Sequence, residues 1–91
     1  MVQKTISAAI TNARGLHARA SAKFVETAAR FKSEVTVRKG DTTVSGRSIM
    51  SLMMLAASKG SIIELTAEGE DAEDALRALS TLIAARFHED A

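Results

Sequence analysis

The sequence has no cysteine, proline, tryptophan or tyrosine, and three phenylalanines are its only large aromatic side chains. Without cysteine the chain forms no disulfide, offers no thiolate nucleophile and holds no cysteine-bound zinc. With so few aromatic rings it also lacks the surface on which bases of single-stranded nucleic acid stack. Aliphatic residues must therefore fill the core.

Long apolar runs and an excess of one charge are also missing. No stretch approaches the roughly 18 apolar residues of a membrane-spanning helix, and the first residues lack the pattern of a secretion signal. The formal net charge of +1 is far from the basic excess of nucleic-acid binders. We therefore expect one cytoplasmic domain over residues 1–91 that binds other proteins, inserts into no membrane, and uses neither a cofactor nor a metal ion.

The periodicity of apolar residues predicts seven elements. Alternation of apolar and polar residues predicts strands at residues 2–10, 33–38, 42–45 and 62–67. Helical spacing predicts helices at residues 18–32, at 49–57, and from 69–71 to at least 83. Ser48 would cap the second helix and Gly60 would end it. The order βαββαβα favours an α+β fold: a two-layer open-faced sandwich, with a four-stranded, mainly antiparallel sheet covered on one face by three helices.

The two histidines differ in context. His88 lies in the polar terminal segment, and we expect it to be solvated and without a role. His17 lies between Gly15 and the first turn of the long helix, where unpaired backbone N–H groups and the helix dipole attract an anion such as phosphate. The same field favours the neutral, nucleophilic imidazole, and the guanidinium of Arg19 can pair with phosphate oxygens. These features make His17 a candidate phosphoryl acceptor.

Three segments of the chain resemble those of a known family. They are Gly15-Leu16-His17-Ala18-Arg19, Arg47-Ser48-Ile49-Met50 and Lys59-Gly60. Together they resemble HPr, the histidine-containing phosphocarrier of the bacterial phosphotransferase system, and the resemblance extends from Gln3 to about Phe87. Residues 86–90 and 54–60 look closer to the nitrogen-related branch, NPr, than to the carriers for sugar transport.

The resemblance implies a role for each motif. His17 would accept a phosphoryl group on Nδ1 from the phosphoenolpyruvate-dependent enzyme I and pass it to an enzyme IIA-type domain. Arg19 would orient and partly neutralise that group. Ser48 would be the residue that an HPr kinase/phosphorylase modifies, which would place negative charge near the docking surface. Such a protein is a stoichiometric carrier with a phosphohistidine intermediate and not an enzyme, and we expect a monomer.

Periodicity and resemblance disagree about the short helix. Spacing alone predicts a buried face made of Ile49, Leu52, Met53 and Ala56. The resemblance instead implies that Leu52 and Leu55 are buried. It also implies that the apolar residues Ile49, Met50 and Met53 are exposed beside His17. We follow the resemblance and predict four partner-binding residues, whose flexible members can repack against different surfaces: Leu16, Ile49, Met50 and Met53.

One residue departs from the family pattern. The family usually has proline directly after His-Ala-Arg, whereas this chain has Ala20. Proline pre-sets the backbone in a first helical turn and lacks a donor that would have no partner there. Because alanine is an excellent helix former, we expect the helix to form around a less rigid site.

Two other function classes stay open at the level of sequence. In the first, the chain is a non-catalytic regulatory binding module, whose docking is controlled by phosphorylation of Ser48 while His17 is idle. In the second, it is an α+β nucleic-acid-binding domain, which its charge and aromatic content disfavour. Acid-labile phosphorylation that disappears in His17→Ala distinguishes the carrier from the binding module.

Overall fold

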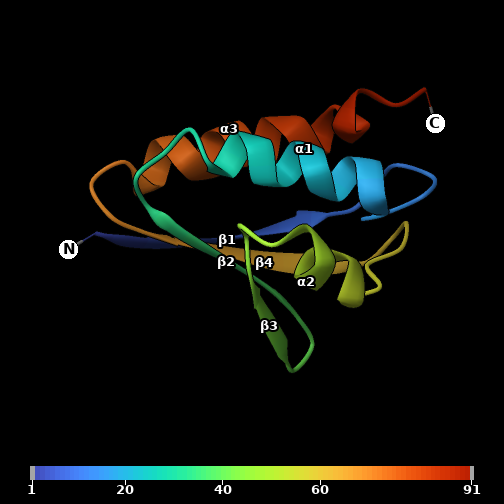
Figure 1. The fold of residues 1–91 in the computed structure, drawn as a ribbon, viewed down its shortest axis with the longest axis horizontal. Coiled ribbons are helices and arrows are strands. Elements are labelled where there is room, and N and C mark those ends of the chain that lie inside the picture. Colours follow the sequence, from blue (N-terminus) through green and yellow to red (C-terminus); the bar gives the residue numbers. More distant parts are fainter. Residues whose placement is uncertain (1, 91) are drawn as a thin grey trace.

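The computed structural model describes residues 2–90 and has the predicted order of elements, with one more short helix near the C-terminus (Figure 1). The strands are β1 (Gln3–Ala9), β2 (Glu34–Lys39), β3 (Thr42–Ser45) and β4 (Ile62–Glu68). The helices are α1 (Ala18–Ala28), α2 (Ile49–Met54) and α3 (Ala72–Ala84), followed by the 3₁₀ helix η1 (Arg86–His88). The predicted α+β open-faced sandwich is confirmed.

The four strands form one antiparallel sheet in the order β1-β4-β2-β3. Its register aligns one hydroxyl-bearing residue from each strand, since Thr5 pairs with Thr66, Thr66 with Thr36, and Thr36 with Ser45. The hydroxyl oxygens of Thr5 and Thr66 are 3.0 Å apart. In Figure 1, α1 and α3 lie side by side over one face of the sheet, opposite to the face that carries these hydroxyl groups. Helix α2 packs against α1 and β3.

The core lies between the sheet and the helices. Successive side chains of a strand point to opposite faces, so every second residue of β2 and β4 points toward α1 and α3. This alternation buries Val35 and Val37 of β2 as predicted. The largest fully buried apolar side chains are Phe24, Phe87, Ile10, Leu52, Ile63, Leu65, Leu79, Val35 and Val37.

Helix α1 ends at Ala28, before the predicted end at residue 32. The backbone N–H groups of Lys32 and Ser33 donate to the carboxylate of Asp71, each at 2.9 Å. A longer helix would bond these N–H groups to its own carbonyl oxygens, but here the side chain of Asp71 accepts their hydrogen bonds instead. The predicted C-terminal end of this helix is therefore wrong, because a carboxylate distant in sequence competes for its backbone.

Helix α2 ends at Met54, before the predicted end at residue 57. Ala56 has a left-handed backbone with φ of 51°, which the helix cannot include. The Nζ atom of Lys39 donates to the carbonyl oxygens of Leu55 and Ala56, at 3.2 and 3.1 Å. The prediction that Gly60 ends this helix is wrong, because Gly60 lies in the turn that precedes β4.

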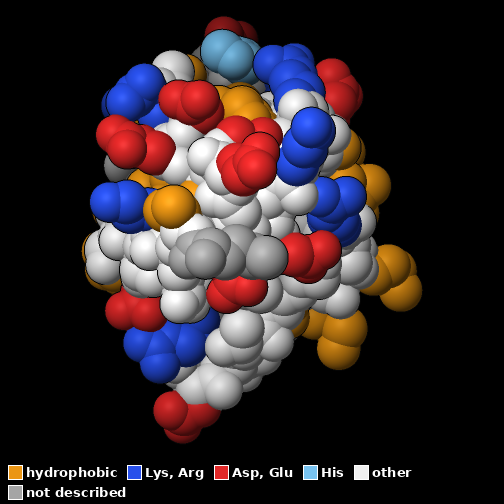
Figure 2. Space-filling model, turned by 90° about the vertical axis from the view of Figure 1, so that its left-hand side faces the viewer, with side chains coloured by type: hydrophobic (Ala, Val, Ile, Leu, Met, Phe, Trp, Pro, Cys, Tyr) orange, Lys and Arg blue, Asp and Glu red, His pale blue; other side chains and the backbone are white. Residues whose placement is uncertain are grey.

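The surface carries charges of both signs. Figure 2 shows acidic and basic side chains interspersed over the end of the molecule that lies on the left in Figure 1. Across residues 2–90, every helix is too short or too polar to span a membrane.

Candidate functional site

The loop between β1 and α1 is pressed against the segment that follows α2. Gly15 is buried and has a φ of 65°, and a Cβ atom added to it would lie 2.2 Å from the carbonyl oxygen of Ala57. The backbone N–H of Leu16 donates to the same oxygen at 2.9 Å. Only glycine combines this backbone conformation with so close an approach. These contacts fix the point at which His17 enters α1.

His17 is the N-cap residue of α1, and its carbonyl oxygen accepts the first helical bond, from the N–H of Ser21 at 2.9 Å. The N–H groups of residues 18–20 precede this bond and have no acceptor within the helix. The His17 side chain makes no capping bond to them in the described chain. It is 22% exposed and lines a hollow of about 190 Å³. The imidazole is therefore open to solvent beside a helix end that attracts anions.

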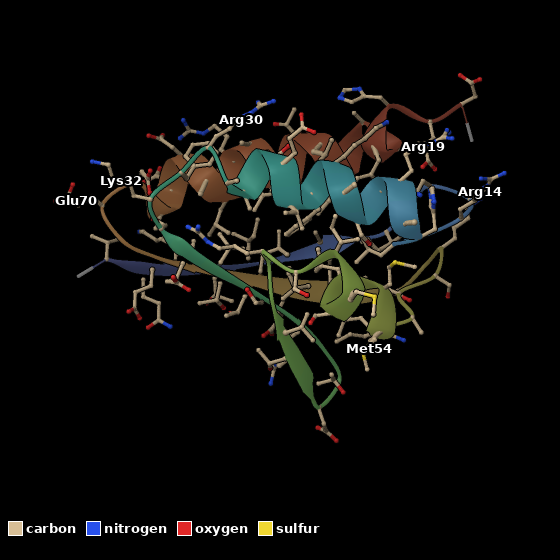
Figure 3. All side chains as sticks on the ribbon, viewed as in Figure 1. Arg14, Arg19, Arg30, Lys32, Met54 and Glu70 are labelled. Atoms are coloured by element: carbon tan, nitrogen blue, oxygen red, sulfur yellow. The ribbon has the colours of Figure 1, made fainter. Side chains whose placement is uncertain are left out.

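Two arginines lie at this end of α1 (Figure 3). Arg19 is exposed in the first turn of the helix, and Arg14 is exposed in the preceding loop. Both line a second hollow of about 310 Å³, together with Lys23, Glu89 and Asp90. Its lining therefore combines three basic side chains with two carboxylates. The structure thus places Arg19 at the same helix end as His17.

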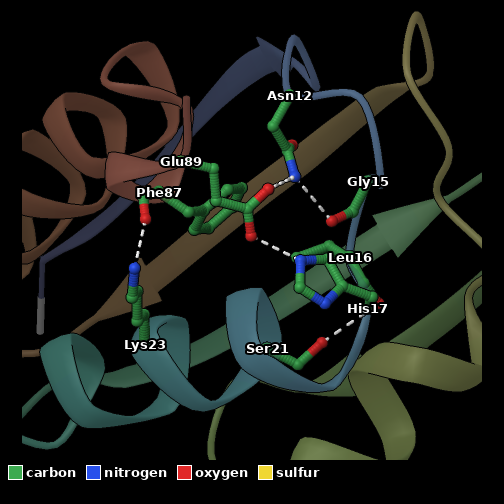
Figure 4. Close-up of polar contacts among 8 residues, drawn as sticks. All are labelled: Asn12, Gly15, Leu16, His17, Ser21, Lys23, Phe87 and Glu89. Carbon is green, nitrogen blue, oxygen red and sulfur yellow. Dashed lines mark hydrogen bonds and ion pairs between the residues drawn. The ribbon is translucent and has the colours of Figure 1, made fainter. Parts of the chain in front are cut away.

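Glu89 is part of this site, although the sequence analysis missed it. Its Oε2 atom contacts Nε2 of His17, and its Oε1 atom accepts a hydrogen bond from Nδ2 of Asn12 at 2.9 Å (Figure 4). Burial raises the pKa of the Glu89 carboxyl, but the bonds from Asn12 and His17 and the positive charges of His17 and Lys23 together hold the pKa below its ordinary value. An ionised carboxylate therefore faces the imidazole at neutral pH.

The terminal segment folds back onto the site, which corrects the prediction that it is a solvated tail. Phe87 is fully buried, and its carbonyl oxygen accepts a hydrogen bond from Nζ of Lys23 at 2.5 Å. His88 itself is exposed, as expected. Phe87 is the sequence signal that could have indicated this docking, because a large apolar residue beyond the stripe of α3 needs its own burial.

Helix α2 packs against α1 and β3. The Oγ atom of Ser48 caps it by accepting a hydrogen bond from the N–H of Ser51 at 3.1 Å, as predicted. Leu52 and Leu55 are buried. The apolar residues Ile49, Met50 and Met53 are 40%, 73% and 41% exposed. The exposure that the resemblance implied is confirmed, and the buried face that spacing alone predicted is wrong at three of its four positions: Ile49, Met53 and Ala56.

Two further expectations concern the residues beside His17. We predicted that Leu16 binds partners, but its side chain is only 4% exposed and belongs to the core. A buried side chain offers almost no area to another protein, so Leu16 leaves the predicted partner-binding set. Ala20 is fully buried in the first turn of α1, and the helix forms without the family's proline, as expected.

Comparison with known proteins assigns the chain to a family. The family described as the PTS HPr component phosphorylation site matches residues 4–85. The chain belongs to the HPr family. A phosphocarrier protein HPr from Neisseria meningitidis is 59% identical over 80 residues, which are 88% of this chain and 90% of that protein.

Solved HPr structures have the same fold. The structure of HPr-C-His from Thermoanaerobacter tengcongensis is 43% identical, with a TM-score of 0.92, and the match covers 97% of this chain and 99% of that one. A phosphocarrier protein HPr from Bacillus anthracis is 38% identical, with a TM-score of 0.86 and coverage of 91% and 99%. Membership of the HPr family makes this chain a phosphocarrier of the phosphotransferase system, and a carrier rather than an enzyme.

Proposed function

We propose that His17 carries the phosphoryl group, which it accepts on Nδ1 from enzyme I of the phosphotransferase system and passes to an enzyme IIA-type domain. The observation that carries this proposal is the partly exposed imidazole at the start of α1, where the first backbone N–H groups have no acceptor within the helix and Arg19 lies in the first turn. Each protein molecule then holds one phosphoryl group at a time, and its release requires a second protein.

The transfer is a displacement at phosphorus. The Nδ1 lone pair of His17 attacks the phosphorus atom of the phosphorylated donor, while the bond between phosphorus and the donor breaks and its electron pair stays with the donor. The new nitrogen–phosphorus bond breaks in the next step, when a nucleophile of the acceptor protein attacks phosphorus and the electron pair returns to Nδ1. No water molecule takes part, so the phosphoryl group is conserved.

Arg19 and the start of α1 stabilise the charge on the phosphoryl oxygens. In the transition state this charge is spread over three oxygens, which a planar guanidinium and several backbone N–H groups can bind together. Arg19 is exposed and therefore able to turn toward these oxygens when a donor docks. Arg14 lines the same hollow and adds attraction for acidic partner surfaces.

We also propose that partners dock on the exposed apolar patch of α2, which consists of Ile49, Met50 and Met53. An exposed apolar centre beside basic side chains is typical of a small, transient protein interface. Flexible methionine side chains repack against different surfaces, which suits a carrier that meets a donor and an acceptor in turn. Arg47, an exposed cation, lies two positions before Ile49 in the sequence.

Phosphorylation of Ser48 by an enzyme of the HPr kinase/phosphorylase type would regulate this docking. Ser48 directly precedes Ile49 and Met50, so a phosphate on its Oγ atom would add about two negative charges at the edge of the patch. Ser48→Asp tests this role. Weaker binding of the folded variant to enzyme I supports it, and unchanged binding contradicts it.

Transfer of label tests the proposal for His17. The protein is incubated with enzyme I and radiolabelled phosphoenolpyruvate, and the label is then exposed to mild acid. We expect acid-labile label on the wild type and on the matched control His88→Ala, and none on His17→Ala. Absence of label on the wild type would contradict the proposal and favour the regulatory binding module. Label that persists in His17→Ala would place the phosphoryl group on another residue.

A further inference from the structure

The backbone conformation of the segment after α3 fixes the position of Glu89. Three consecutive residues, 86–88, have left-handed backbones with φ between 55° and 62°, a conformation that costs energy for any residue except glycine. Burial of Phe87 and the hydrogen bond from Lys23 to its carbonyl oxygen stabilise this turn. The turn brings Glu89 beside His17, although 72 positions separate them in the sequence.

Asn12 fixes the orientation of the Glu89 carboxylate. Its side chain is fully buried, and its amide nitrogen donates to the carbonyl oxygen of Gly15 and to Oε1 of Glu89, both at 2.9 Å. Both partners are acceptors, so the nitrogen and not the oxygen of the amide must face them. The other carboxylate oxygen, Oε2, is then directed at the imidazole of His17 (Figure 4).

An ionised carboxylate only accepts hydrogen bonds, so the nitrogen that faces it must carry the proton. The nitrogen that faces Glu89 is Nε2 of His17. A neutral imidazole has a single N–H group, and placing it at Nε2 leaves the lone pair on Nδ1. The two nitrogens lie on opposite sides of the ring carbon Cε1, so a group bound to Nδ1 does not collide with Glu89.

We propose that Glu89, held by Asn12, is a positioning residue for the phosphorylation of His17, because it keeps the ring proton on Nε2 and leaves Nδ1 free to attack phosphorus. This inference rests on the proposed role of His17. During transfer the proton stays on Nε2, and the ring becomes positively charged as Nδ1 forms its bond to phosphorus. The carboxylate of Glu89 stabilises that charge without taking the proton.

The test measures the tautomer and the transfer rate in the same variants. Glu89→Gln keeps the shape of the side chain but replaces one acceptor oxygen by a donor, so it no longer requires a proton on Nε2. Asp41→Asn is the matched control, because it removes an exposed carboxylate in the turn between β2 and β3. The ¹⁵N shifts of the His17 ring nitrogens in the full chain at about pH 8, where an ordinary histidine is neutral, report the tautomer.

We expect the proton on Nε2 in the wild type and in Asp41→Asn, and a mixture of tautomers in Glu89→Gln. We also expect Glu89→Gln to accept the phosphoryl group about 10 to 100 times more slowly, the range found when the hydrogen-bond partner of a metal-bound histidine is removed. Unchanged ring shifts in Glu89→Gln, or an unchanged rate, would overturn the inference. The ring shifts need no phosphoryl donor, so they test Glu89 even if His17 proves not to be phosphorylated.

Discussion

The two ends of the layer formed by α1 and α3 have two structural features in common, a tightly packed glycine and a hydrogen-bonded carboxylate. At the start of α3, Gly69 has a φ of 147°, and a Cβ atom added to it would lie 2.6 Å from the hydroxyl oxygen of Ser33. At the start of α1, a Cβ atom added to Gly15 would lie even closer, 2.2 Å from the carbonyl oxygen of Ala57. Each end also holds a carboxylate that accepts several hydrogen bonds: the carboxylate of Asp71 at the first end and that of Glu89 at the second.

The donors to these two carboxylates differ, and so do the consequences. Asp71 accepts bonds from the backbone N–H groups of Lys32 and Ser33 and from the Ser33 hydroxyl, none of which titrates near neutral pH. One donor to Glu89 is the imidazole of His17, which we propose carries the phosphoryl group. The same arrangement therefore locks a loop at one end and holds the proposed phosphoryl acceptor at the other.

Alanine at the two glycines gives the largest expected effect and tests whether only one end serves transfer. Gly15→Ala and Gly69→Ala should each lower the free energy of unfolding by about 2 kcal/mol or more, because each forces a left-handed φ and an overlap of Cβ with a neighbour. Urea unfolding measures this loss. Only Gly15→Ala should also slow phosphorylation of the folded protein, because it displaces His17. Equal slowing in both variants would remove the distinction between the ends.

Arginine substitutions at the two ends of α1 test whether only its first turn serves phosphoryl transfer. Arg19→Ala should lower the rate of phosphoryl transfer about 10- to 100-fold, because it removes a positive group from the transition state. Arg30→Ala removes an exposed arginine just beyond the other end of the helix and should leave the rate unchanged. Rapid-quench measurement of labelled protein gives both rates. A full rate in Arg19→Ala would mean that the backbone N–H groups stabilise the phosphoryl oxygens alone.

Docking provides a smaller difference. Met50→Gln should weaken binding to enzyme I about fivefold, which corresponds to about 1 kcal/mol, because it places an amide in an apolar contact. Val2→Gln changes an exposed apolar residue at the opposite end of the molecule and should have no effect. Isothermal titration with enzyme I measures both affinities. Equal weakening in the two variants would contradict a docking surface on α2.

The smallest expected effect is the pH dependence of the Asp71 end. Hydrogen bonds from the Ser33 side chain and from the Lys32 backbone hold the pKa of Asp71 below its ordinary value. A carboxyl with a lowered folded-state pKa contributes stability above its unfolded pKa, and this contribution is lost as the pH falls through the folded pKa. Asp71→Asn should therefore lose less stability on acidification than the wild type, as urea unfolding at a series of pH values will show. Asp41→Asn, in the exposed hairpin turn, should follow the wild type.

The sequence predicted the fold and the place of His17 at the start of a helix, because both depend on local patterns. Alternation in the strands and the apolar stripe of α3 set which of their side chains are buried. The helical spacing of apolar residues in α1 places the start of that helix directly after His17. The ends of α1 and α2 were not predictable from periodicity. They depend on Asp71 and on Lys39, whose side chains reach the backbone from other elements.

The sequence by itself determined the order of the elements, the apolar faces of the long helices and the position of His17, because these follow from the repeat distances of strands and helices. Only the tertiary structure decided which carboxylate faces the imidazole. Asn12, His17 and Glu89 come from the two ends of the chain, and no sequence period connects them. They meet because the side chain of Phe87 is buried in the core, which folds the terminal segment back to the start of α1.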